Sequence, residues 1–198
     1  MHIDSRKAAQ IVAIALLVTV ITQIAYLVLE AGGQSHIAYP IWRTEAVLAL
    51  VVAVLGFALF SRDAIVGGCL VAGGTFNLFQ TGMGLTMFYQ LGYGGEGAPE
   101  PAFFAVLGFS FFLYFAAKAA LGIAALVLGV DLWRGRAGLW RWLGLLAALA
   151  GVAGLALNLW AMAMGMAAVF IAGAAGTVAT FLLALALLAG DAKDEAAA

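Results

Sequence analysis

The sequence predicts an all-α integral membrane protein whose six transmembrane helices form a single bundle, and three observations carry this prediction. Of the 198 residues, 66% are hydrophobic and only 10% are charged, whereas soluble domains carry about 25% charged residues. The apolar residues form continuous runs as long as the ~20 residues that a helix needs to cross a bilayer. They do not alternate as in a membrane β-barrel. Lysine and arginine also gather in alternate connections between these runs, as in multi-pass proteins.

The predicted spans follow one another with short connections. They lie near residues 8–29, 44–60, 64–91, 102–132, 139–159 and 162–189, in one domain at 1–190 that precedes a short polar tail at 191–198. Polar or glycine-rich stretches separate the first five spans. The first span has a longer apolar part than a signal peptide, so we count it as a helix.

The boundary between the last two spans is predicted from length alone, because the connecting stretch NLWAMAMGM carries no charge. As one helix, the roughly 51 residues from Leu139 to Ala189 would be ~75 Å long. The apolar part of a bilayer is only ~30 Å thick. The segment is therefore expected to fold back once.

Positive charges predict the orientation. With six spans, seven basic residues fall on one side and one on the other, with Lys118 on neither. The majority side holds Arg6, Lys7, Arg62, Arg134, Arg136, Arg141 and Lys193, and the other side holds Arg43. Both termini are then expected on the cytoplasmic side. The Ala/Gly/Leu-rich composition points to a bacterial inner membrane.

Small and polar residues recur every three or four positions in four of the spans, which places them on one face of each helix. Such faces pack against other helices, whereas large apolar residues face lipid. The rows are Thr19, Gln23, Tyr26 and Glu30; Gly73, Asn77, Gln80, Thr81 and Gly84; Ser110, Tyr114, Lys118 and Gly122; and Gly144, Ala147, Ala148, Gly151, Gly154 and Asn158. At ~1.5 Å per residue, the polar members of the rows reach similar depths, between the midplane and the outer face.

Lys118 is the most informative residue because it lies near the centre of a span. An ionisable residue at that depth is costly, and it is usually paired or functional. We expect Lys118 to point inward, toward Asn77, Gln80 and Gln23, or to extend its stem outward toward Glu30 or Glu45.

Two interpretations of Lys118 follow. In the functional one, it anchors an outward-facing cavity that binds a small anion or a lipid head group, or carries a proton. The residues predicted to line that cavity are Lys118, Tyr114, Asn77, Gln80, Gln23, Tyr26, Asn158, Glu30 and Glu45. In the structural one, Lys118 joins two helices by pairing with a carboxylate or an amide oxygen. A buried lysine can also form a Schiff base with a retinal-like cofactor, but nothing else in the sequence requires such a cofactor.

Methionines near the predicted outer ends of the spans raise the possibility of a Cu(I) site, because thioethers are soft ligands. The candidates are Met83, Met87, Met162, Met164 and Met166, with His36 in the first outer loop. Ordinary packing of adaptable apolar side chains is the simpler interpretation. In one continuous helix, Met162 and Met166 would share a face and Met164 would point away.

Absent motifs, the single cysteine and the net charge exclude several classes of function. The sequence has no metalloprotease, serine hydrolase or P-loop motif, and it requires no cofactor. The single cysteine rules out an intramolecular disulfide, and the net charge of −1 gives no reason to expect a nucleic-acid partner.

Three functional hypotheses remain. The first is a transporter-like or solute-binding membrane protein with a polar cavity at Lys118. The second is a non-catalytic subunit or assembly factor, which would form homo- or hetero-oligomers through the small-residue face of Gly144, Ala148, Gly151 and Gly154. The third is a copper-handling protein or a membrane enzyme.

Overall fold

The computed structural model describes residues 4–31, 37–93 and 101–196, with the side chains of Glu30 and of residues 191–196 outside the described part. The described chain is helical, and its long helices are α1 (Ser5–Ala31), α2 (Ala38–Leu59), α3 (Ala64–Met83), α4 (Pro101–Gly135), α5 (Gly138–Met164) and α6 (Val169–Ala196). A π-helical turn, η2 (Gly84–Phe88), and a 3-10 turn, η3 (Tyr89–Leu91), prolong α3. A 3-10 turn, η4 (Gly165–Ala168), separates α5 from α6.

The chain is a multi-pass helical membrane protein. Five segments of the described residues are long and apolar enough to cross a bilayer, and the last of them, Gly138–Gly190, contains both α5 and α6. Large apolar side chains on these helices are exposed on the outside of the bundle, for example Ile21, Phe57 and Phe170. In a membrane, such side chains face lipid instead of water.

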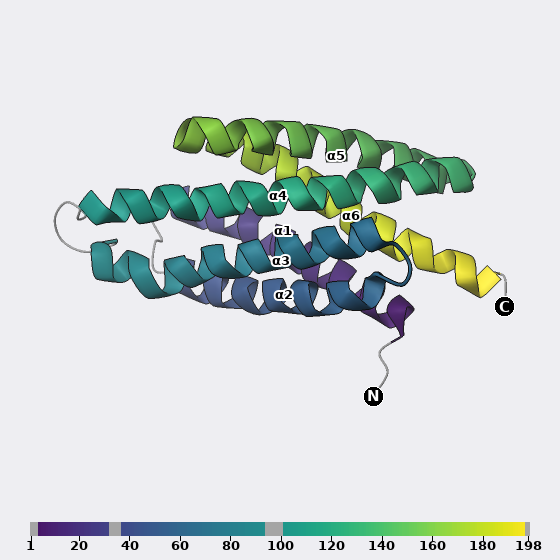
Figure 1. The fold of residues 1–198 in the computed structure, drawn as a ribbon, viewed down its shortest axis with the longest axis horizontal. Coiled ribbons are helices and arrows are strands. Elements are labelled where there is room, and N and C mark those ends of the chain that lie inside the picture. The colour runs from purple at the N-terminus through teal and green to yellow at the C-terminus, as the bar shows by residue number, and fades with distance from the viewer. Residues whose placement is uncertain (1–3, 32–36, 94–100, 197–198) are drawn as a thin grey trace.

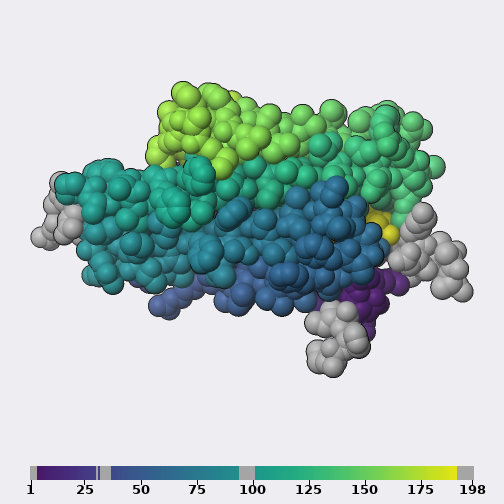
Figure 2. All heavy atoms as spheres, in the orientation of Figure 1, coloured from purple at the N-terminus to yellow at the C-terminus, as the bar shows by residue number. Residues whose placement is uncertain are grey.

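The helices form a ring with one helix outside it. In this ring α1 packs on α2, α2 on α3, α3 on α4, α4 on α6, and α6 on α1, while α5 packs against the outer side of α4 and α6 (Figure 1). Figure 2 shows the resulting elongated outline, with α3, α4 and α5 side by side on the visible face. The ring leaves an interior between α1 and α4 that long side chains can reach.

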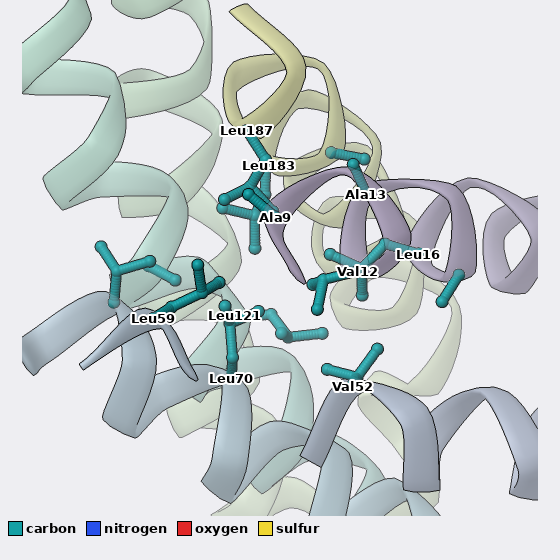
Figure 3. Close-up of a cluster of buried hydrophobic side chains, with 14 of the residues drawn as sticks. Ala9, Val12, Ala13, Leu16, Val52, Leu59, Leu70, Leu121, Leu183 and Leu187 are labelled. Carbon is teal, nitrogen blue, oxygen red and sulfur yellow. The ribbon is translucent and has the colours of Figure 1, made fainter. Parts of the chain in front are cut away.

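An apolar cluster fills one half of the ring. It brings together Val12 of α1, Val52 of α2, Leu70 of α3, Leu121 of α4 and Leu183 of α6 (Figure 3). These side chains are at most 3% exposed. The polar interior described below begins immediately beyond this cluster.

Glycines let α4 and α5 approach until their backbones touch. A Cβ atom at Gly129 would lie 2.5 Å from the backbone nitrogen of Ala148, and one at Gly151 would lie 2.5 Å from that of Leu126. The small-residue face of α5, predicted as an interior face, is therefore buried against α4 of the same chain. An oligomer would have to use another surface.

The chain turns back between α5 and α6 at Gly165, which has a φ of 61°. Glycine adopts such a positive φ without steric cost. The predicted break, after residue 159, was too early: α5 continues to Met164. Within this helix Asn158 donates its amide to Gly154 O (2.7 Å) and Ala172 O (3.0 Å) and so joins α5 to α6.

Two other helix boundaries differ from the prediction. α2 begins at Ala38 and not near residue 44, because Pro40 lies in its first turn, where the missing N–H of proline costs nothing. α6 continues to Ala196, through most of the expected polar tail. Arg136, at the α4–α5 turn, donates to the backbone oxygens of Ala189 (2.9 Å) and Gly190 (3.3 Å) and so holds α6 to that turn.

Asp63 fixes the start of α3, and its replacement gives a first prediction. Its carboxylate accepts hydrogen bonds from the backbone N–H groups of Ile65 (2.8 Å) and Val66 (2.9 Å). We expect Asp63→Ala to lower the free energy of unfolding by about 1 kcal/mol, the usual cost of losing an N-cap. Thermal unfolding in detergent, followed by circular dichroism, measures this change. Asp63→Asn keeps the cap and should unfold like the wild type; equal losses in both variants would contradict the capping role.

Candidate polar site in the bundle interior

Lys118 is completely buried in the middle of α4. Its Nζ donates to Gln23 Oε1 of α1 at 2.8 Å and to Thr180 Oγ1 of α6 at 3.4 Å. The absence of a side chain at Gly176 makes room for it, since a Cβ there would lie 2.8–2.9 Å from the Lys118 stem. The lysine thus points inward, as predicted, and both of its described acceptors are uncharged.

Gln23 joins the hydrogen bonds of three helices. Its Oε1 accepts from Lys118 Nζ and also from Thr177 Oγ1, which lies 3.2 Å away on α6. Thr180 donates its own proton to Gly176 O at 2.7 Å, so its oxygen is free to accept from Lys118. The ammonium group also lies 5.5 Å from the centre of the Tyr114 ring, within the range of a cation–π interaction. We call Lys118, Gln23, Tyr114, Thr177 and Thr180 the lysine network.

A small cavity adjoins this network on the side of α2 and α3. Its volume is about 10 Å³, roughly the space of one water molecule. The wall residues with polar side chains are Thr19, Gln23, Glu45, Asn77 and Thr81. Glu45 is held by Thr22, whose hydroxyl donates to Glu45 Oε1 at 2.9 Å. Gln23 belongs to both the cavity wall and the lysine network, so the two form one polar site.

The structure brings some of the predicted site residues together. Gln23 and Tyr114 contact Lys118 directly. Asn77 and Glu45 lie in the wall of the adjoining cavity. Gln80 is half-buried, and it is neither in that wall nor among the described partners of Lys118.

Three other predicted residues are not among the described contacts of Lys118. Asn158 is buried, but its hydrogen bonds are those that clamp α5 to α6. Tyr26 packs beside the Trp42 ring, with 6.1 Å between ring centres. The backbone of Glu30 is in α1, but its side chain is outside the described residues.

The expected outward-facing cavity proves much smaller than a solute-sized vestibule. One helical turn beyond it lies an aromatic cluster formed by Tyr26, Trp42, Phe88, Tyr93 and Phe103. The Trp42 ring packs so closely on Gly84 that a Cβ there would lie 2.9 Å away. Bulky rings thus occupy the region that the prediction assigned to an open cavity.

Sequence reasoning missed the contribution of α6 to the site. Thr177 and Thr180 provide hydrogen bonds, and Gly176 provides space. The signal was present, because Gly173, Gly176 or Thr177, and Thr180 recur every three or four residues, as in the other rows.

The methionines lie in separate apolar surroundings. Met83 and Met87 line an apolar groove between α3–η2 and α4, whereas Met162 packs with the cluster around Phe115. Met164 and Met166 are exposed at the end of α5 and in η4, because the helix ends between them. Met162 and Met166 therefore do not belong to one continuous helix, and the shared face expected of such a helix does not arise. His36 lies outside the described residues, and in the described part no group of three His, Cys, Asp or Glu side chains is arranged to hold a metal ion.

Comparisons of the chain with protein families, curated proteins and solved structures gave no match. The interpretation of the site therefore depends on its chemistry. The Lys118 ammonium is bonded to Gln23, and Gln23 shares with the Glu45 carboxylate the wall of a cavity with room for about one water molecule. Such a site can hold a proton or a small ion.

Proposed function

We propose that the protein is a transporter-like or solute-binding membrane protein in which Lys118 is the central group of the binding site. The observation that carries this proposal is the complete burial of Lys118 against uncharged acceptors, Gln23 and Thr180, in a helix of membrane-spanning length. A buried ammonium without a bonded carboxylate is a costly arrangement. The free-energy cost of the buried ammonium has a functional reason if the site binds a charged species during a transport cycle.

The small cavity fits a closed state of such a protein. The aromatic cluster around Trp42 lies beyond the cavity on α1, α2 and η2, and a larger solute would reach Lys118 only after these rings move. The π-helical turn η2 lies in this same region, and π-helical turns are frequent at functional sites.

We further propose that the chain crosses the membrane six times with both termini in the cytoplasm. The reversal at Gly165 supports separate crossings for α5 and α6. The basic residues Arg6, Arg62, Arg134 and Arg141 lie near helix ends that meet at one end of the bundle, where the N- and C-termini also lie (Figure 1). Arg43 is near the opposite end. This distribution agrees with the positive-inside rule, and the composition suits a bacterial inner membrane.

The experiment compares the wild type with Lys118→Met after purification in mild detergent. Native mass spectrometry reads bound small molecules, and the same preparation reveals partner chains. We expect a solute that is present in the wild type and lost in Lys118→Met. Lys7→Met, which removes an exposed lysine near the start of α1, is the matched control and should retain the solute.

The competing hypothesis of a complex subunit has a different outcome in the same experiment. A wild type without bound solute that purifies with partner chains in fixed proportion would overturn the proposal. Lys118 would then serve to hold α1, α4 and α6 together.

A further inference from the structure

The cavity beside Lys118 is lined by oxygen-bearing side chains of three helices. Thr19 and Gln23 come from α1, Glu45 from α2, and Asn77 and Thr81 from α3. Together they supply a carboxylate, two carboxamides and two hydroxyls. Hard cations prefer such oxygen ligands.

Several of these oxygens have lone pairs to spare. Thr19 and Thr81 donate their protons to backbone oxygens of their own helices, at 2.9 Å from Ala15 O and 2.9 Å from Asn77 O, so each hydroxyl oxygen can still accept. Thr22 hydrogen-bonds only one carboxylate oxygen of Glu45, Oε1. Asn77 adds a carboxamide oxygen to the same wall.

The charge and the size of the cavity limit the occupant. Glu45 is the single charged residue of the wall as described, so a monovalent cation balances it, whereas a divalent one would leave an uncompensated buried charge. The volume of about 10 Å³ admits one particle of about the size of a water molecule. The occupant must therefore enter without its hydration shell.

We propose that this cavity is a binding site for a monovalent cation the size of Na⁺, with Glu45 as its charge partner and the Lys118 ammonium as its built-in competitor. Lys118 Nζ lies 2.8 Å from Gln23 Oε1, an atom of a wall residue. An ammonium donates hydrogen bonds and accepts none, so it cannot share that oxygen with a second cation without repulsion.

Competition of this kind couples the cation to a proton. When Na⁺ enters, the Lys118 ammonium gives its proton to water, so one positive charge enters the site as one leaves. In the described part, the titratable groups that act on Lys118 are Glu45 on α2 and Tyr114 on its own helix. The elements α1 and α6 present uncharged Gln23, Thr177 and Thr180, and no titratable group of α3 or α5 is among the described partners of Lys118. The inference builds on the proposed function and adds a coupling ion to the solute that Lys118 binds: Na⁺ in exchange for H⁺.

The test is thermal unfolding of the full chain in detergent with NaCl, KCl or choline chloride at equal ionic strength, so that general screening is the same. We expect NaCl to raise the melting temperature saturably, because a ligand that binds only the folded state stabilises it. KCl and choline chloride should not do so. The effect of NaCl should be stronger at alkaline than at acidic pH.

Two variants separate the roles of the charges. Glu45→Gln should abolish the Na⁺ effect, whereas Asp131→Asn, which changes an exposed carboxylate on α4, should leave it intact. Lys118→Met should bind Na⁺ about tenfold more tightly at neutral pH, because the competing ammonium is gone. If Glu45→Gln or Lys118→Met is already unfolded in the absence of salt, Thr19→Val is tested in its place, because it removes one ligand oxygen from the cavity wall. Thr86→Val, at an exposed threonine, is the control for Thr19→Val.

The outcomes also separate this inference from the proposed function. If NaCl stabilises the wild type and Lys118→Met no more than choline chloride does, the cation site is overturned, even where mass spectrometry finds a solute that depends on Lys118. If Na⁺ stabilises the wild type through Glu45 but Lys118→Met binds it no more tightly, the competition is overturned. If Na⁺ binds as predicted while the chain purifies as a subunit, the cation site stands and the transporter proposal falls.

Discussion

Replacing Gly129 with leucine is expected to prevent α4 and α5 from packing. The Cβ position of Gly129 is 2.5 Å from Ala148 N and 2.7 Å from Gly144 O, so backbone atoms, which cannot rotate away, occupy the space that the new side chain needs. We expect Gly129→Leu to cost at least about 3 kcal/mol, the upper end of the usual cost of overpacking. Loss of the monodisperse peak in size-exclusion chromatography after heating measures this change.

Gly108 offers a matched control in the same helix. It is exposed, and a Cβ there would meet no described atom within 4 Å. Gly108→Leu should leave the melting temperature unchanged or raise it, because leucine favours a helix by a few tenths of a kcal/mol or more over glycine. Equal melting temperatures for the two leucine variants would show that α4 and α5 do not pack as described.

The second large effect is expected from Gln23→Leu. This change removes the shorter hydrogen bond of the buried Lys118 ammonium, which is 2.8 Å long, and also the acceptor of Thr177. A buried charge that loses its partner costs several kcal/mol, so we expect the free energy of unfolding to fall by about 3 kcal/mol. Gln90→Leu, at an exposed glutamine in η3, is the control and should have little effect.

A double-mutant cycle isolates the interaction between Gln23 and Lys118. Lys118→Met puts an apolar chain of similar shape in place of the lysine, and such replacements of buried charges are often neutral or stabilising. The double variant Gln23→Leu/Lys118→Met should therefore be more stable than Gln23→Leu alone. Strictly additive losses would contradict direct coupling of the two residues.

Most of the architecture was predictable from the sequence, because apolar run length and small-residue spacing are strong signals in membrane helices. The small-residue face of α5 is buried as expected, from Gly144 to Gly154. Helix ends were harder to predict where no charge marks them. In the structure, α5 ends at Met164, and Gly165, which follows it, has a positive φ. The stretch 139–189 contains several glycines, and the sequence alone does not tell which of them adopts that conformation.

The polar site was predictable in part. The inward direction of Lys118 followed from the cost of its charge, and Gln23 lies on the predicted helix face, within hydrogen-bond distance of Lys118. The choice among Gln23, Asn77 and Gln80 depends on which helices are neighbours, and helical periodicity does not contain that information. In the ring, α6 lies next to both α1 and α4, so threonines of α6 complete the contacts that the prediction assigned to α3.

The lysine network also joins helices that are synthesised at different times. Gln23 belongs to the first helix of the chain, Lys118 to the fourth, and Thr177 and Thr180 to the last. A ribosome delivers α1 and α4 to the membrane well before α6, and domains generally begin to fold from the N-terminal end. Until α6 is in place, Lys118 lacks its hydrogen bond to Thr180, and Gln23 lacks its hydrogen bond from Thr177. Arrival of α6 therefore completes the lysine network, and a chain that stops before α6 carries an incompletely satisfied ammonium.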